Sequence, residues 1–323
     1  MEPTFPLFRL PDNVIVQVLQ NTNLNQLLII SLVSTKSKNF VLLLGLRARY
    51  MSISIWHRIS SYVYIGNSSF ASRFYDDSND QNKLSVDTTL PVDAFLPFEN
   101  ETIQSSTPFN FRDWLNHIKS VFSCTKPPSI KFYRGCERFE VQSLKDAIGN
   151  VDFLYVDSEV PNVYSKEVLK YFNAPNKMTL VKNPFGEACE VQKLFLQNYE
   201  RIAFRDVCSL DDILLVNCEK VELCHQISQK QFNQFIKHWI RGSNPRLQYM
   251  DLSIDNSHSV SREVLLKGIH FIGVAKEDQV EICRNHLIIS DNQVKIKRKD
   301  GTPAVIAMNE KRDILKVHFI VLY

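Results

Sequence analysis

The N-terminal segment is patterned as three short apolar helices. Pro11 suits the first turn of a helix, where its missing N–H would have had no partner. The helix after it carries apolar residues at helical spacing: Val14, Ile15, Val18 and Leu19. Asn23 can cap a second helix, and residues 38–44 predict a third. Helices this short bury too little surface by themselves, so a partner protein or the rest of the chain must complete their core.

The pattern changes to a period of two at residue 50. The stretches YMSISIW and RISSYVYIG alternate apolar and polar residues with few residues between them, which predicts an antiparallel hairpin. Residues 111–123 return to a helical stripe. Residues 228–242 form the clearest amphipathic helix, with Ser228 as its N-cap and Gly242 as its C-cap. Asp300 and Gly301, between two alternating runs, predict a second hairpin near the C-terminus.

A repeating rhythm occupies the middle of the chain. Short strand-like stretches begin at residues 153, 178, 201, 220 and 247, with helical or irregular segments between them. This spacing is typical of leucine-rich repeats, although the asparagine ladder of regular repeats is missing. The pattern therefore predicts an α/β protein: an N-terminal three-helix unit followed by an irregular leucine-rich-repeat-like α/β horseshoe with flanking β-hairpins. Another α/β arrangement of the same strands remains open.

Alternation within those strands predicts which side chains point outward. Apolar pairs such as Leu154 and Val156 would face the core, and the residues between them would face the open surface of the sheet. The outward candidates are Tyr155, Arg205, Glu222 and Gln248. An aromatic residue beside a mixed-charge pair suits a protein-binding patch, where Tyr and Arg tend to carry the energy. The alternative interpretation is that these are ordinary solvated strand positions.

Composition narrows the classes of partner. The chain has 323 residues, with 38 Lys and Arg against 35 Asp and Glu, a formal net charge of +3 that gives no electrostatic case for nucleic acid. Its seven cysteines lack framework spacing, and we expect no secretory leader, so we predict reduced thiols in a cytoplasmic or nuclear protein. Apolar runs such as FVLLL are far shorter than a membrane span, so we expect no membrane association.

The sequence offers no catalytic constellation. Cys224 and His225 are adjacent, and neighbouring residues on a strand point to opposite faces, so they do not suit a nucleophile and its base. Asp211 and Asp212 are better interpreted as helix-start acids than as a catalytic dyad. Zinc-type ligand clusters and glycine-rich phosphate loops are missing. We therefore expect no catalytic residues, no metal and no cofactor.

Two stretches carry a family resemblance. The stretch FPLFRLPDNVIVQVLQNTNLNQLLIISLVSTKSKNFV resembles an F-box, with its Leu-Pro step and three helices. The stretch NQFIKHWIRGSNPRLQYMDLSI, residues 233–254, is similar to the type 2 F-box-associated domain of the nematode F-box proteins, and FRDWLNHIKSVF resembles the opening helix of that domain. The resemblance divides the chain into an F-box at residues 1–50 and an F-box-associated substrate-recognition region at residues 51–323.

This resemblance implies a function and a partner. In F-box proteins the spare apolar surface of the helices packs on the Skp-family adaptor of a cullin–RING ubiquitin ligase. Carried to this sequence, the adaptor-binding set is Leu10, Pro11, Ile15, Val18, Leu19, Leu28, Leu32 and Val33. The chain would then be a substrate-recognition adaptor that joins an unknown protein substrate to the Skp-family adaptor and, through it, to a cullin. The alternatives are a repeat-type interaction scaffold outside any ligase, whose helices pack on its own C-terminal region, and an enzyme with an unrecognised site.

Overall fold

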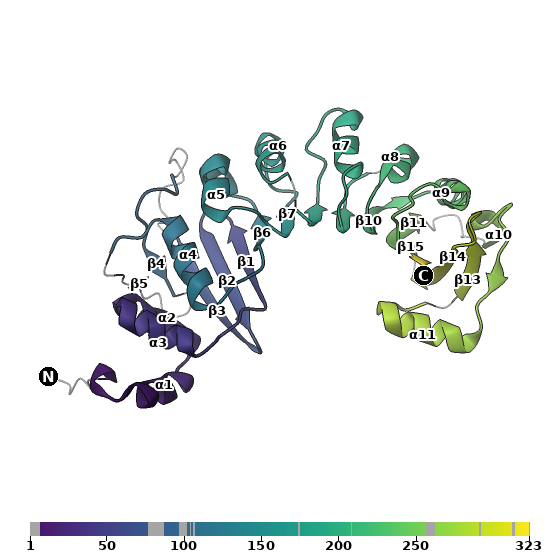
Figure 1. Ribbon diagram of the computed structural model, residues 1–323. Coiled ribbons are helices and arrows are strands. Elements are labelled where there is room, and N and C mark those ends of the chain that lie inside the picture. Colours follow the sequence, from purple (N-terminus) through teal and green to yellow (C-terminus); the bar gives the residue numbers. More distant parts are fainter. Residues whose placement is uncertain are drawn as a thin grey trace. The chain divides into compact units, whose positions relative to one another are not determined.

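The N-terminal helices form much as their apolar pattern predicts (Figure 1). The computed structural model describes residues 7–76, 87–96, 102–103, 105, 107–173, 175–207, 209–255, 262–290, 292–311 and 314–322. The first elements are η1 (Leu7–Arg9), α1 (Asp12–Gln20), α2 (Leu24–Val33) and α3 (Thr35–Leu43). The side chain of Asn23 caps α2, as predicted, by accepting a hydrogen bond from the backbone of Gln26. Helix α3 begins earlier than predicted because Ser34 and Ser37 form a capping box.

These helices belong to the first of two compact units, Met1–Pro175. Its strands are β1 (Tyr50–Ile55), β2 (Ile59–Ile65), β3 (Ser68–Phe74), β4 (Ala94–Phe95), β5 (Thr102–Ile103), β6 (Ser129–Phe132) and β7 (Phe153–Val156). They lie in the order β7-β6-β1-β2-β3-β4-β5, with β7, β6 and β1 parallel and the other neighbours antiparallel. Its remaining elements are α4 (Phe111–Val121), η2 (Cys136–Arg138), α5 (Val141–Ile148) and α6 (Asn162–Tyr171).

Helices cover one face of this sheet. Phe74 of β3 meets the rings of Phe111 and Trp114 from α4, with centroids 5.2 and 6.2 Å apart. Phe132 of β6 meets Phe172, at the end of α6, at 5.7 Å. Helices α2 and α3 also pack against α4, so the N-terminal helices share a core with the first sheet. The side chains on the other face of the sheet point away from these helices.

The second unit, Asn176–Tyr323, alternates helices with parallel strands before closing with antiparallel ones. Its strands are β8 (Lys177–Leu180), β9 (Arg201–Phe204), β10 (Lys220–Ile227), β11 (Tyr249–Asp255), β12 (Ile272–Gly273), β13 (Asn292–Lys297), β14 (Pro303–Lys311) and β15 (Ile314–Val321). Its helices are α7 (Ala188–Phe195), α8 (Leu210–Leu215), α9 (Gln229–Arg241), α10 (Arg262–Leu265) and α11 (Lys276–His286). Strands β8 to β11 are parallel, and the order β12-β13-β14-β15-β11 is antiparallel.

The best amphipathic helix of the sequence lies where it was predicted. Helix α9 begins after a capping box formed by Ser228 and Gln231 and ends at Gly242, whose φ of +120° suits glycine. Trp239 of this helix is fully buried, and its ring centroid lies 4.9 Å from that of Phe319 in β15. The inward face of this sheet is therefore buried under a helix, as that of the first unit is.

The coarse prediction of the fold is confirmed. The chain is a mixed α/β protein with three N-terminal helices, the predicted hairpins β1–β2 and β13–β14, and strands at each of the five predicted stretches. The leucine-rich-repeat-like horseshoe and the division at residue 50 stay predictions. Within the described ranges, no helix has both the length and the apolarity that crossing a bilayer requires.

Candidate interaction surfaces

Half of the predicted adaptor-binding set lies in the interior of the chain. Ile15, Leu19 and Leu28 are fully buried, and Leu32 is 6% exposed. They are core residues because α1, α2 and α3 pack on one another and α2 packs on β3. Their assignment to a partner interface is therefore corrected, since a buried side chain cannot reach a partner while these helices stay folded.

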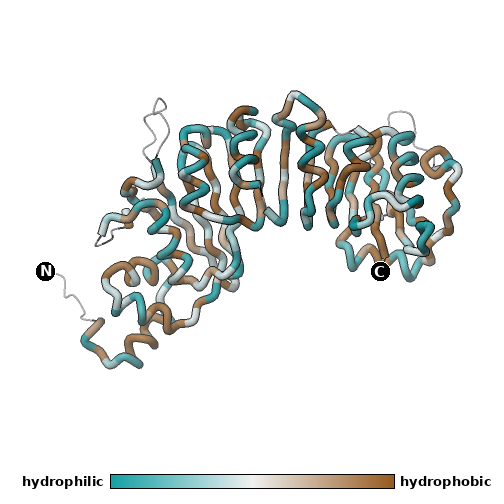
Figure 2. Tube along the Cα trace, turned by 45° about the horizontal axis from the view of Figure 1, so that its top comes forward, coloured by the Kyte–Doolittle hydropathy of each residue, from teal (hydrophilic) through white to brown (hydrophobic). Residues whose placement is uncertain are grey.

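The other half of the set remains accessible. Val18 and Val33 are 43% and 60% exposed, Pro11 is exposed and Leu10 is half-buried. Sequence reasoning missed four further exposed apolar side chains on the same elements: Phe8, Ile29, Leu42 and Leu43. Figure 2 shows hydrophobic stretches along these N-terminal helices. The missed signal was that α2 is apolar on every side, so burying one face leaves another uncovered.

A polar contact joins the N-terminal helices to the first sheet unit. The Ser31 hydroxyl donates to the Leu28 carbonyl at 2.6 Å, so its oxygen accepts from His117 Nε2, 2.7 Å away on α4. This arrangement requires a proton on His117 Nε2. Burial, helped by the charge of Lys38, lowers the pKa of His117 to about 4. The helices are thus fixed to α4 by a hydrogen bond as well as by packing.

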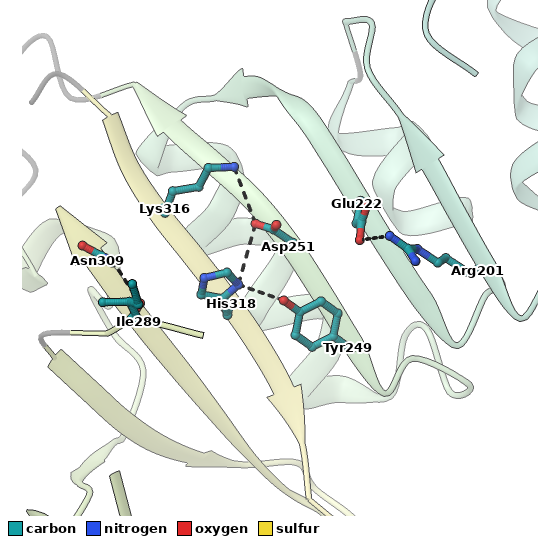
Figure 3. Close-up of polar contacts among 8 residues, drawn as sticks. All are labelled: Arg201, Glu222, Tyr249, Asp251, Ile289, Asn309, Lys316 and His318. Atoms are coloured by element: carbon teal, nitrogen blue, oxygen red, sulfur yellow. Dashed lines mark hydrogen bonds and ion pairs between the residues drawn. The ribbon is translucent and has the colours of Figure 1, made fainter. Parts of the chain in front are cut away.

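The second unit carries a charged cluster on the sheet face opposite its helices α7 to α9 (Figure 3). The Tyr249 hydroxyl and His318 Nδ1 lie 2.9 Å apart in a hydrogen bond, and Asp251 Oδ1 lies 3.8 Å from both His318 Nδ1 and Lys316 Nζ. Burial raises the pKa of Asp251, and the charges of Lys316 and His318 oppose that rise. Burial lowers the pKa of His318, against the effect of Asp251. A neutral His318 suits a ring nitrogen that accepts from tyrosine.

The four predicted substrate-facing residues are not gathered at one place within either unit. Tyr155 lies in β7 of the first unit, and the other three lie in the second. Glu222 stands on the open face of β10, where it pairs with Arg201, as Figure 3 shows. Arg205 is exposed just after the end of β9.

Gln248 was assigned to the wrong place. It precedes β11 and is held by main-chain hydrogen bonds, donating to Glu219 and accepting from Val321. The buried residues of β11 are Met250 and Leu252, so the open positions are Tyr249 and Asp251. The prediction counted the alternation from Leu247, and a shift of one residue exchanges the two faces of a strand.

The adjacent Cys224 and His225 do not follow strand alternation either. The register of β10 against β11 shifts between Leu223 and Gln226, which makes this pair a bulge, and both residues are exposed. Among the described residues, no group of three His, Cys, Asp or Glu side chains could hold a metal ion.

Comparison with known proteins finds two family models that match parts of this chain. A model described as F-box domain matches residues 7–49, from η1 to the start of the first sheet, and one described as F-box associated matches residues 190–252, from α7 to β11. The chain is 25% identical over 305 residues to the F-box associated domain-containing protein sdz-33 of Caenorhabditis elegans, covering 93% of this chain and 92% of that protein. No solved structure matches. The chain therefore carries an F-box domain at residues 7–49 and an F-box associated domain at residues 190–252.

Proposed function

We propose that this chain is the substrate-recognition adaptor of an SCF-type cullin–RING ubiquitin ligase. Its F-box binds a Skp-family adaptor, which connects it to a cullin, and the region after the F-box holds a protein target. The chain performs no chemistry itself. It raises the effective concentration of the target near the RING subunit and the conjugating enzyme, which transfer ubiquitin.

The observation that carries this proposal is the apolar surface left on the F-box helices after their core is complete. Val33 is 60% exposed and Leu43 is 69% exposed, and Val18 adds a third such side chain on α1. Burying a fully exposed side chain of this kind contributes roughly 1.5 to 3 kcal/mol, so covering the exposed half or so of each contributes about 1 kcal/mol, and several together help to offset the costs of association. A protein partner is the natural cover for exposed apolar residues gathered on neighbouring helices.

The finer architecture is part of the same proposal. An irregular leucine-rich-repeat-like horseshoe over residues 51–323 is supported by the alternation of helices with the parallel strands β8 to β11. Such an array presents the open face of its strands to a partner. The division into residues 1–50 and 51–323 then separates adaptor binding from target binding.

Co-expression with a Skp-family adaptor, followed by size-exclusion chromatography, tests the proposal. We expect one shared peak for the wild type and separate peaks for Val33→Asp combined with Leu43→Asp, because the two carboxylates would enter an apolar interface without partners. Val163→Asp is the matched control, since Val163 is 82% exposed on α6. Circular dichroism checks that each variant is folded.

A repeat-type interaction scaffold is the second candidate. The buried half of the predicted set and the Ser31–His117 hydrogen bond favour it, because they let the helices cap the first sheet without any partner. Wild-type protein that elutes apart from the adaptor would support the scaffold. Unchanged co-elution of the double variant would move the adaptor interface away from these helices.

A further inference from the structure

The face of the first sheet that points away from α4, α5 and α6 is covered with aromatic and serine side chains. Register places directly opposed residues of neighbouring strands on the same face, and the inward positions are the buried ones, such as Ile53, Ile130 and Leu154. The aromatic residues at the outward strand positions are Tyr50, Tyr62, Tyr64, Phe95, Phe153 and Tyr155. The outward serines are Ser52, Ser54, Ser60, Ser69 and Ser129, of which Ser52 and Ser60 are buried. We call this surface, together with Trp56 and Tyr133 at the strand ends, the aromatic face.

The rings of the aromatic face are packed on one another. Tyr50 and Tyr64 are stacked with centroids 4.3 Å apart, and Trp56 and Tyr133 are stacked at 4.1 Å. Tyr155 extends the second stack, 5.4 Å from Tyr133. Burial raises the pKa of Tyr64 and of Tyr133, and the charge of Tyr62 adds to both rises.

This surface is rigid and yet open to solvent. Gly135 has a φ of +90°, and a Cβ there would lie 2.9 Å from the backbone nitrogen of His57, so only glycine lets the loop after β6 approach the β1–β2 turn. Arg138 donates to the His57 carbonyl at 2.6 Å, and the Tyr133 backbone donates to that of Ile55. With the turn held in this way, the Trp56 side chain is still 42% exposed. The side chains of Tyr50 and Tyr62 are 44% and 36% exposed.

The aromatic face carries few charged side chains, and one cation at its strand positions has no ion-pair partner among the described residues. The charged outward positions on its strands are Lys131 and Arg73, and Arg73 pairs with Asp76 at 3.4 Å. No described residue forms an ion pair with Lys131, which stands between Ser54 of β1 and Tyr155 of β7 in the register. Asp157, just beyond β7, accepts a hydrogen bond from the Tyr155 hydroxyl at 2.7 Å and places one negative charge at the edge of the face.

We propose that the aromatic face binds an extended segment of the target protein in which one Asp or Glu is flanked by proline or aliphatic residues. Lys131 pairs with the carboxylate of the segment, and the two ring stacks cover its apolar side chains. Tyr and Trp rings give contact area at little cost in conformational entropy, and the accessible hydroxyls of Ser54, Ser69 and Ser129 supply hydrogen bonds to the backbone of the segment. This inference rests on the proposed function, because it names the surface that holds the target.

Single-stranded nucleic acid is the other polymer that stacks on aromatic side chains. It needs a groove of several cations along its phosphates, whereas the aromatic face has Lys131 as its unpaired strand cation and the chain has a net charge of only +3. A protein segment with a single carboxylate matches one lysine better.

Selection from a phage library of random dodecapeptides on the full chain, purified with its Skp-family adaptor, tests the proposal. We expect the library to be enriched in peptides with an acidic residue next to proline or aliphatic residues. A labelled enriched peptide should bind at least about tenfold more weakly to Trp56→Ala and to Lys131→Glu than to the wild type. Lys131→Glu should also bind the same peptide better after its acidic residue is replaced by lysine. Lys220→Glu, at an outward position of β10, is the matched control and should leave binding unchanged.

The outcomes separate this inference from the proposed function. Failure to enrich peptides, enrichment without acidic residues, or binding that survives both variants would overturn the aromatic face as the target site. Binding of oligouridylate in place of peptides would also overturn it. Co-elution with the Skp-family adaptor under any of these results would leave the proposed function standing, whereas loss of co-elution in the wild type would remove that function.

Discussion

The two units expose opposite kinds of sheet surface, although both bury their inward faces under helices. The open face of the first unit carries stacked rings such as Trp56 on Tyr133, with serines between them. The open face of β9 to β11 and β15 carries ion pairs instead: Arg201 with Glu222 and Lys316 with Asp251. Tyr249 is the single aromatic residue at the described outward positions of β8 to β11.

This difference indicates a division of roles. Charges that are already paired with one another are solvated and screened, and they offer a partner little net gain. Exposed rings held in place by a glycine contact and an arginine lose little freedom on binding, so contact with a partner stabilises them further. The first unit is therefore the better candidate for target binding, and the matched F-box associated segment, residues 190–252, lies in the second.

The largest expected effect is a difference in stability between two Trp→Ala variants. Trp239→Ala should lower the free energy of unfolding of the second unit by about 3 to 5 kcal/mol, because it leaves a cavity beside Phe319. Trp56→Ala should cost less than about 1 kcal/mol, because the ring is 42% exposed. Urea unfolding followed by circular dichroism measures both. Equal losses would show that Trp56 is a core residue and would end the distinction between packed and open faces.

Sequence periodicity was sufficient to find the elements whose two sides differ. The apolar stripe around Trp239 located α9, and turn residues located the hairpin at Gly301. Periodicity failed where a helix is apolar on all sides, because the pattern then does not show which side is buried. Helix α2 is apolar all round, so the sequence could not show that Leu28 is buried while Val33 is exposed.

The aromatic face could not be found from sequence for a different reason. Trp56 and Tyr133 directly follow β1 and β6, Tyr155 lies in β7, and only the parallel register of these three strands brings the rings together. Tyr155 alone was identified, because its own strand alternates. Long-range pairing is set by the whole core and not by any short stretch of sequence.

A smaller effect tests whether the aromatic face is held rigid by Gly135. Gly135→Ala should lower the free energy of unfolding by about 2 to 3 kcal/mol. The alanine would have to adopt a left-handed backbone conformation, and its Cβ would meet the backbone of His57. Gly66→Ala is the control, because Gly66 has a φ of +56° but no atom lies near the added Cβ. This variant should lower the free energy of unfolding by about 1 kcal/mol. Thermal unfolding gives both losses. Equal losses of stability would mean that the turn relieves the contact with His57 at little cost and does not hold the rings in place.

Lowering the pH should reduce the free energy of unfolding of the first unit, because His117 is harder to protonate in the folded chain than in the unfolded chain. Its pKa of about 4 in the folded chain lies below the ordinary value of 6.5, so the unfolded chain binds more protons between these values. The stability that His117 contributes is complete above pH 6.5 and is lost as the pH falls toward 4, costing up to about 2 kcal/mol after allowance for solvent screening. His117→Gln should flatten that part of the pH profile in urea unfolding. An unchanged profile would show that another group carries the acid sensitivity.

The smallest effect concerns the ion pairs of the second unit. Glu222→Gln removes one charge of the pair with Arg201, whose side chain is 48% exposed, and should change the free energy of unfolding by less than about 0.5 kcal/mol. Because water and salt already screen these charges, raising the salt concentration should shrink even that difference. Urea unfolding of both proteins at low and high salt gives the measurement, with Lys177→Gln, which removes a charge from the exposed pair with Glu200, as the control. A loss above about 2 kcal/mol that disappears in salt would show that the charged face stabilises its unit as strongly as packing does. The second sheet would then be a surface under strong structural constraint, and the contrast with the aromatic face would concern stability and not target binding.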